Sequence, residues 1–281
     1  PFIWQKNYEG GMGQNTAGSN LNDKKNDRDI DMYVIAPIIF FSKDIKINPY
    51  GVLLHSKDAF GLPGAYGSAF DNLNAYIFGF DFDAKMGPAS LWFTGIMQRG
   101  SGTVNASVNA GLAATINAMP FTAAKDKGAL VPGDEVDLAG YLVAAGGKFD
   151  LGKADIHAQA FYATGEDAHG VSDHKLNGYF TTWSTAYGWA EIMGGGVFDN
   201  SAVGNTVSYG APAAFGSGAP APTNVVAANI GVTVKPMDKL TVSADIWYAK
   251  LAEKNIWGED YLGTEVDLKV TYQLVEGLTL D

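Results

Sequence analysis

The chain has no cysteine, few basic residues and no long apolar run. Without cysteine, a disulfide scaffold and a thiolate site for zinc or an iron–sulfur cluster are excluded. Its 19 Lys and Arg residues stand against 30 Asp and Glu residues, so the formal net charge of −11 provides no positive field for nucleic acid. Because no run of about 18 or more apolar residues occurs, membrane-spanning helices are excluded as well.

Glycine and aromatic residues are abundant instead. The chain contains 35 glycines, 12% of its residues are aromatic, and only 17% are charged. Aromatic content at this level argues against broad disorder, and the charged fraction lies below the usual ~25%. This composition favours an all-β protein whose strands face something other than water.

Neither end of the sequence resembles a natural terminus. The first residues after Pro1 are apolar, there is no initiating Met or signal peptide, and Asp281 falls where a strand begins. We therefore expect a segment truncated at both ends, with residues 1–281 forming a single domain.

Alternation at period two is the clearest pattern. Apolar side chains occupy every second position in the segments Val226–Val234, Leu240–Tyr248 and Val266–Leu274. Successive side chains of a strand point to opposite faces, so each segment has one apolar and one polar face. Less regular alternation predicts further strands upstream, near 30–41, 45–56, 76–83, 91–97, 136–142 and 156–162.

The connections between these strands alternate between short and long. Short turns are expected near 42–44, 85–88, 150–153, 236–239 and 275–277. Long loops are expected near 10–28, 57–71, 100–134, 165–224 and 253–262. Short turns at one end and long loops at the other are typical of a transmembrane antiparallel up-and-down β-barrel, and about 11 such strands are visible. Periodicity alone also allows a soluble β-sandwich binding module, with the apolar face inside and water outside.

Three C-terminal segments resemble a known family: Trp189–Gly194 with Val197–Asp199, Ala228–Leu240, and Tyr261–Leu268 with Thr271 and Tyr272. They are similar to bacterial outer-membrane porin-like barrels related to the alginate-export family, and the similarity covers roughly residues 187–281. The resemblance implies a Gram-negative outer membrane, contact with lipid and lipopolysaccharide, closure at about 16–18 strands, and a homo-oligomer, a trimer in many porins.

A pore needs a polar lining, and the polar faces of the expected strands supply one. Acids outnumber bases among these positions, and rings of Asp and Glu favour cations. The same charges could serve only to keep the wall wet. The pore-lining candidates are Asp81, Asp83, Asp137, Asp155, His157, Asp245, Glu265, Asp267 and Lys269.

Two of the long loops have distinctive compositions. The loop at 100–134 carries Asn105, Asn109 and Asn117 and apolar residues at spacing four, which predicts a constriction loop with a short helix or an external loop. The loop at 165–224 ends in an uncharged, Gly- and Pro-rich stretch typical of a flexible external loop or a partner-binding surface. Its aromatic residues Trp183, Tyr187 and Trp189 fit an interface belt.

Evidence for metal binding is weak, and evidence for catalysis is weaker. Asp23, Asp27, Asp29 and Asp31 supply oxygen ligands for Ca²⁺ but lack the EF-hand spacing and glycine, so a solvated loop is the simpler interpretation. The four histidines form no HExxH, and no Gly-x-Ser-x-Gly elbow occurs. We expect neither an enzyme nor a cofactor.

The sequence thus predicts a porin: a water-filled, cation-leaning channel for passive diffusion of small hydrophilic solutes or ions. Two other barrel functions remain open at this point. One is export of an acidic polysaccharide, which would call for more basic residues in the lumen than this segment offers. The other is a structural barrel that scaffolds a surface or electron-transfer assembly.

Overall fold

The computed structural model describes residues 2–8, 30–58, 70–104, 133–165, 174–179, 190, 193, 224–254, 258–275 and 278–280. Every regular element in these ranges is a strand, and no helix among them could span a membrane. The strands are β1 (Phe2–Tyr8), β2 (Ile30–Ile35), β3 (Ile39–Phe40), β4 (Ile45–Asp58), β5 (Phe70–Met86), β6 (Ala89–Val104), β7 (Glu135–Leu138), β8 (Tyr141–Asp150), β9 (Ala154–Ala163), β10 (Lys175–Leu176), β11 (Val225–Met237), β12 (Leu240–Leu251), β13 (Tyr261–Val275) and β14 (Leu278–Leu280).

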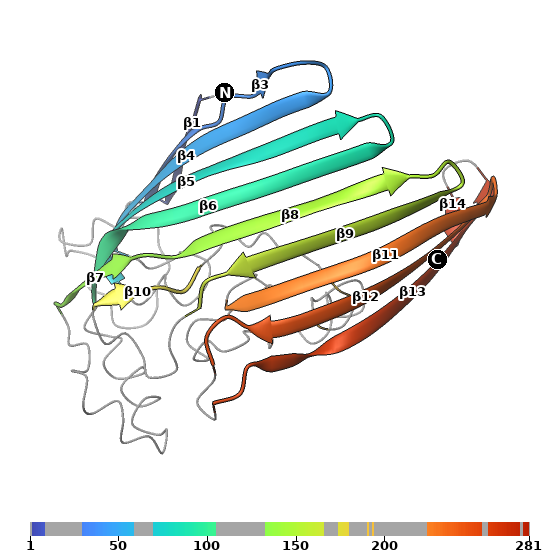
Figure 1. Cartoon of the computed structure of the whole chain (residues 1–281). Coiled ribbons are helices and arrows are strands. Elements are labelled where there is room, and N and C mark those ends of the chain that lie inside the picture. Colours follow the sequence, from blue (N-terminus) through green and yellow to red (C-terminus); the bar gives the residue numbers. More distant parts are fainter. Residues whose placement is uncertain are drawn as a thin grey trace.

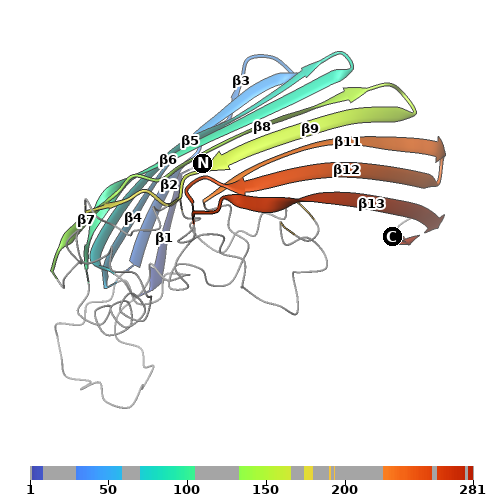
Figure 2. The same ribbon diagram turned by 60° about the horizontal axis from the view of Figure 1, so that its bottom comes forward.

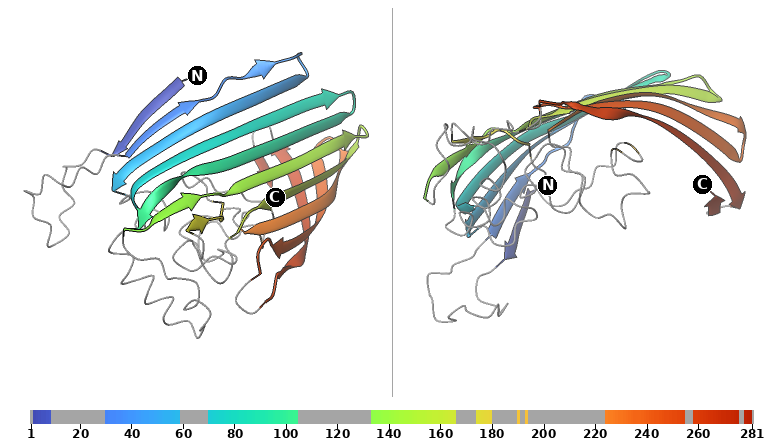
Figure 3. Two further views of the ribbon diagram at one scale, coloured as in Figure 1. Left: turned by 60° about the vertical axis from the view of Figure 1, so that its left-hand side comes forward. Right: turned by 90° about the horizontal axis from the view of Figure 1, so that it is seen from below.

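The strands form one up-and-down sheet, which is antiparallel except for the short parallel pair β7 and β10 (Figure 1). Its main path runs in chain order as β1-β2-β4-β5-β6-β8-β9-β11-β12-β13-β14, with β3, β7 and β10 beside it. Seen from below, the sheet curves into an arc, and no pairing among the described strands joins β1 to β13 or β14 (Figure 3). The expected all-β antiparallel architecture with about 11 strands is confirmed, as an open sheet.

The short turns all lie at one end of the sheet (Figure 2). They join β3 to β4, β5 to β6, β8 to β9, β11 to β12 and β13 to β14, close to the positions expected from the sequence. The strand expected over 30–41 is interrupted at 36–38, where Pro37 offers no N–H to a ladder. Strand β6 runs on to Val104, into the expected loop, and β10 lies within the loop expected over 165–224.

The convex face of the sheet is apolar. Near the short turns and in the middle of the sheet, the outward positions of β4 to β13 carry Val, Ile, Leu, Phe, Ala, Gly, Met, Pro and Tyr. Near the long loops they include one threonine and charged residues such as Arg99 and Lys250. Large side chains on this face are exposed: Phe78 is 51% exposed, Ile230 58%, and Leu268 72%. No described layer covers them.

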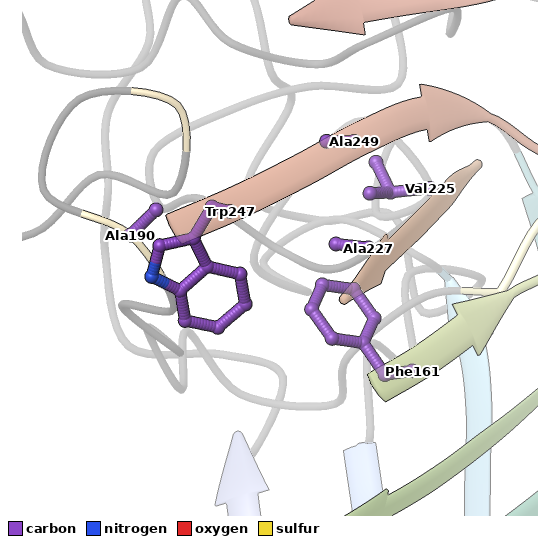
Figure 4. Packing of buried hydrophobic residues seen from close by; sticks show 6 residues of the cluster. All are labelled: Phe161, Ala190, Val225, Ala227, Trp247 and Ala249. Atoms are coloured by element: carbon purple, nitrogen blue, oxygen red, sulfur yellow. The ribbon is translucent and has the colours of Figure 1, made fainter. Parts of the chain in front are cut away.

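The concave face changes character along its length. Near the short turns and in the middle it is polar, whereas near the long loops it becomes apolar and buried. Figure 4 shows the buried part, where the aromatic rings of Phe161 and Trp247 lie on one side of the sheet and Ala190 lies against the indole. The cluster consists of Phe161, Ala190, Val225, Ala227, Trp247 and Ala249.

Candidate functional site

The polar part of the concave face gathers most of the pore-lining candidates. Eight of the nine lie on it: Asp81, Asp83, Asp155, His157, Asp245, Glu265, Asp267 and Lys269. Among all concave positions of β4 to β13, seven carboxylates face five lysines. The excess of acid is smaller than the whole-chain charge implies, but it has the expected sign.

His157 is the centre of a hydrogen-bonded network across three strands. Its Nδ1 lies 3.0 Å from Asp155 Oδ1 on β9, and its Nε2 lies 2.9 Å from Asp245 Oδ1 on β12. Asn229 Nδ2 on β11 donates to the same Asp245 oxygen at 2.6 Å. Only a protonated imidazole donates from both ring nitrogens, so this geometry fits a cation held between two carboxylates.

Gly231 makes this network sterically feasible. It lies on β11 between His157 and Asp245, in register with both. A Cβ at Gly231 would collide with Asp245 Oδ1 and His157 Nε2, so the imidazole crosses β11 only because this residue has no side chain.

We therefore expect Gly231→Ala to break the His157–Asp245 contact and to destabilise the folded protein by about 1–3 kcal/mol, as overpacking usually does. Urea unfolding in lipid vesicles would measure this loss. Gly51→Ala is the control, because a Cβ there would meet nothing closer than 3.6 Å. Equal stability of the two variants would contradict the steric role of Gly231.

Large aromatic side chains on the concave face lie over glycines of neighbouring strands. The phenol ring of Tyr50 covers Gly79, and the indole of Trp92 covers Gly146, where an added Cβ would lie 2.6 Å from three ring atoms. Rings placed in this way lie along the wall and project little from it. Glycine on one strand beside an aromatic residue on the next therefore leaves room above the sheet.

A smaller polar group occupies the concave face of β4 to β6. Lys46 Nζ lies 3.3 Å from Asp83 Oδ2, and Thr94 Oγ1 donates to Asp81 Oδ1 at 2.7 Å. The carboxylates of β5 are thus held by one neighbour on either side, β4 for Asp83 and β6 for Asp81.

At the long-loop end, parts of the segment between β9 and β11 pack on the concave face. Tyr179 and Ala190 are 6% and 5% exposed, and Met193 contacts the cluster that contains Trp247. The backbone N–H of Met193 donates to Glu265 Oε2 at 2.8 Å, so this predicted lining carboxylate also holds the segment in place. The described part of 165–224 therefore folds inward and covers the apolar end of the concave face.

Asp137 does not belong with the other lining candidates. Asp137 is on β7 and pairs with Ser101 of β6. Its side chain lies on the face opposite to the buried Val136 and Leu138. On β7, the apolar side chains lie on the covered concave face and the polar ones on the convex face. In the middle of the sheet, the apolar side chains lie on the convex face instead. Asp137 therefore lies on the convex face, apart from the other eight lining candidates.

Several other candidates lie outside the described residues. Asn105, Asn109 and Asn117 of the expected constriction loop are among them, as are Asp23, Asp27 and Asp29. Asp31 pairs with His55 on the convex side of β2, and no group of three potential metal ligands occurs among the described residues.

A row of tyrosines on the convex face was not identified from the sequence. It runs along the long-loop end, and Tyr141 stacks on Tyr162 with ring centroids 5.6 Å apart. From β6 onward, the row moves about two residues toward the short turns at successive steps, as expected for tilted strands. The signal was one tyrosine near the long-loop end of many alternating segments: Tyr33, Tyr76, Tyr141, Tyr162 and Tyr248.

Comparison with known proteins gives little further information. No family model and no curated protein matches the chain, so the resemblance to alginate-export barrels remains a prediction. Among solved structures, the siderophore receptor PirA from Acinetobacter baumannii is similar over 88% of this chain, with 11% identity and a TM-score of 0.33. The chain spans 38% of that receptor's length. The function of the present chain therefore has to follow from the geometry of the chain itself.

Proposed function

We propose that this chain forms part of the wall of an outer-membrane porin, a water-filled and cation-leaning channel for passive diffusion of small hydrophilic solutes or ions. The observation that carries the proposal is the pairing of two different faces: a convex face that is exposed and uncharged between the short turns and the tyrosine row, and a polar concave face. The convex face would contact lipid, and the concave face would line the lumen.

The dimensions of the apolar band support this proposal. On β11 and β12, about ten residues separate the tyrosine row from the short turns. At about 3.3 Å per residue and a tilt of about 40°, they span a height of about 25 Å, which matches the apolar band of outer-membrane barrels. Charged residues return to this face at or beyond the tyrosines, for example at Asp31, Arg99 and Lys250. Tyrosines at that level suit a membrane interface.

A soluble sandwich fits this face less well. A second sheet would have to cover the side chains of eight strands, and no described residue does so. An exporter of an acidic polysaccharide would need a basic lining, whereas acids outnumber lysines on the concave face.

Single-channel recording of the full-length, detergent-purified protein in a planar bilayer under a KCl gradient tests the proposal. We expect stepwise currents and a reversal potential of the cation-selective sign. A folded, membrane-embedded protein that carries no current would contradict passive diffusion and favour a scaffold function.

Replacing lumen carboxylates should then reduce cation selectivity. Asp245 and Asp267 lie opposite each other on β12 and β13. One unit charge acts on an ion about 10 Å away with about 0.4 kcal/mol in water, so Asp267→Asn should lower the ratio of cation to anion permeability roughly twofold. Asp245→Asn should act in the same direction.

Asp137→Asn is the matched control for these two variants, because Asp137 lies on the other face. A change in reversal potential as large in this control as in Asp267→Asn would contradict the assignment of the concave face to the lumen.

A further inference from the structure

The concave face of β4, β5 and β6 contains a hollow of about 320 Å³, separate from the His157 network. The register places three side chains in one row across the strands and three more in the adjacent row toward the short turns. The first row is Asn48, Asp81 and Thr94, and the second is Lys46, Asp83 and Trp92. Together with Ile38, Phe82 and Phe93, which complete the lining, they are called the β4–β6 hollow.

The β4–β6 hollow is rich in hydrogen-bond acceptors. Asn48 Oδ1 is buried and has no hydrogen-bond partner among the described residues. Asp81 accepts from Thr94 with one oxygen, and Asp83 pairs with Lys46 through one oxygen, so each carboxylate keeps capacity for a further donor. A buried acceptor without a partner is costly, so a turn of the amide that brings Asn48 Oδ1 to a donor in the hollow is favourable.

The charge of the hollow narrows the class of donor. Two aspartates and one lysine leave one net negative charge. The indole of Trp92 borders the same space and is held against the wall over Gly146. An indole attracts cations and alkyl groups alike, so the hollow offers one aromatic surface beside several oxygen acceptors.

We propose that the β4–β6 hollow binds the head group of a primary organic ammonium ion, an inference that rests on the proposed pore because it places such solutes in the lumen. The ammonium group carries three donors and one positive charge, which matches Asn48 Oδ1, one oxygen each of Asp81 and Asp83, and the net charge of the hollow. Its alkyl chain lies along Trp92. A neutral sugar would leave the charge unbalanced, and a quaternary ammonium ion would leave Asn48 without a donor.

Calorimetric titration of the detergent-solubilised, full-length protein with n-butylammonium chloride tests this site. We expect saturable binding of n-butylammonium, at least about tenfold weaker binding of tetramethylammonium, since charged hydrogen bonds contribute about 1.5–3 kcal/mol each, and no measurable binding of glucose. Equal binding of tetramethylammonium, or tighter binding of glucose, would overturn the proposal.

Variants locate the binding. Asn48→Leu and Asp81→Asn should each weaken n-butylammonium binding about tenfold, whereas Asp267→Asn, a carboxylate outside the hollow, should leave it unchanged. Asn48→Asp adds a charged acceptor at the same position and should strengthen binding. Because misfolding does not raise affinity, this variant is the control for a misfolded Asn48→Leu protein. Unchanged affinity in both Asn48 variants would contradict the site.

This titration requires no ion flow, so it separates the two proposals. A protein that binds n-butylammonium but carries no current would contradict only passive diffusion. A conducting protein that binds no n-butylammonium would contradict only the ammonium site.

Discussion

Arginine in place of Val232 is expected to destabilise the membrane-folded protein by about 2–4 kcal/mol, the usual cost of a basic residue at the lipid-facing midplane of a barrel. Val232 is 40% exposed on the convex face of β11, near the middle of the apolar band. Urea unfolding of the protein folded into lipid vesicles measures the loss.

The neighbouring residue provides a closely matched control. Thr233 has nearly the shape of Val232 but lies on the concave face, opposite Ser243 and close to the acidic row of Asp155. Thr233→Arg should change the free energy of unfolding by less than about 1 kcal/mol, because its guanidinium reaches water and carboxylates. If Thr233→Arg proved the more damaging change, the concave face would be the buried one, which would contradict a water-filled lumen on that side.

Replacement of Trp247 by Ala is expected to cost about 3–5 kcal/mol, as truncation of a buried Trp usually does. Trp247 is 3% exposed and packs between the wall and Ala190. Its loss also removes the main apolar contact of the segment that folds over the concave face. We therefore expect the surviving folded protein to conduct more current than the unaltered chain.

Trp247→Phe separates packing from pore width. It keeps an aromatic ring in the cluster, so it should cost less and leave the conductance close to its original value. If Trp247→Ala conducted no better than Trp247→Phe, the segment at 190 and 193 would not restrict the lumen.

The strands and their turns could be predicted from the sequence because a strand between two different environments records both of them in alternate residues. The segments Val226–Val234 and Leu240–Tyr248 are examples, since their apolar positions form the exposed convex face. Alternation does not distinguish lipid from a protein core on the apolar side, and therefore the sequence is also compatible with a soluble sandwich.

The inward fold of the segment between β9 and β11 could not be predicted in the same way. Inward packing depends on which distant side chains a loop meets, and loop composition carries no such information. One signal was nevertheless present. Along β12, the concave positions change from Ser243 and Asp245 to Trp247, Ala249 and Leu251, which indicates that the concave face is covered at the long-loop end.

The position of Asp137 could not be predicted for the same reason. The sequence pattern puts Asp137 on the polar face of its strand, but its apolar neighbours Val136 and Leu138 lie on the concave face, at its covered end. Where a loop buries part of the lumen wall, both faces of a strand become partly apolar, and the polar residue between them no longer marks the lumen.

The most direct test of the account is a single-cysteine scan of positions 240–248 on β12, since residues 1–281 contain no other cysteine. In lipid vesicles, cysteines at Val242, Ala244 and Ile246 should react only with a lipid-soluble thiol reagent, and those at Ser243 and Asp245 with a water-soluble one. Strict alternation of this kind is the result we predict for a membrane-spanning wall that lines a wet lumen. Water-soluble labelling on the Val242 face, or no labelling on the Ser243 face, would contradict it.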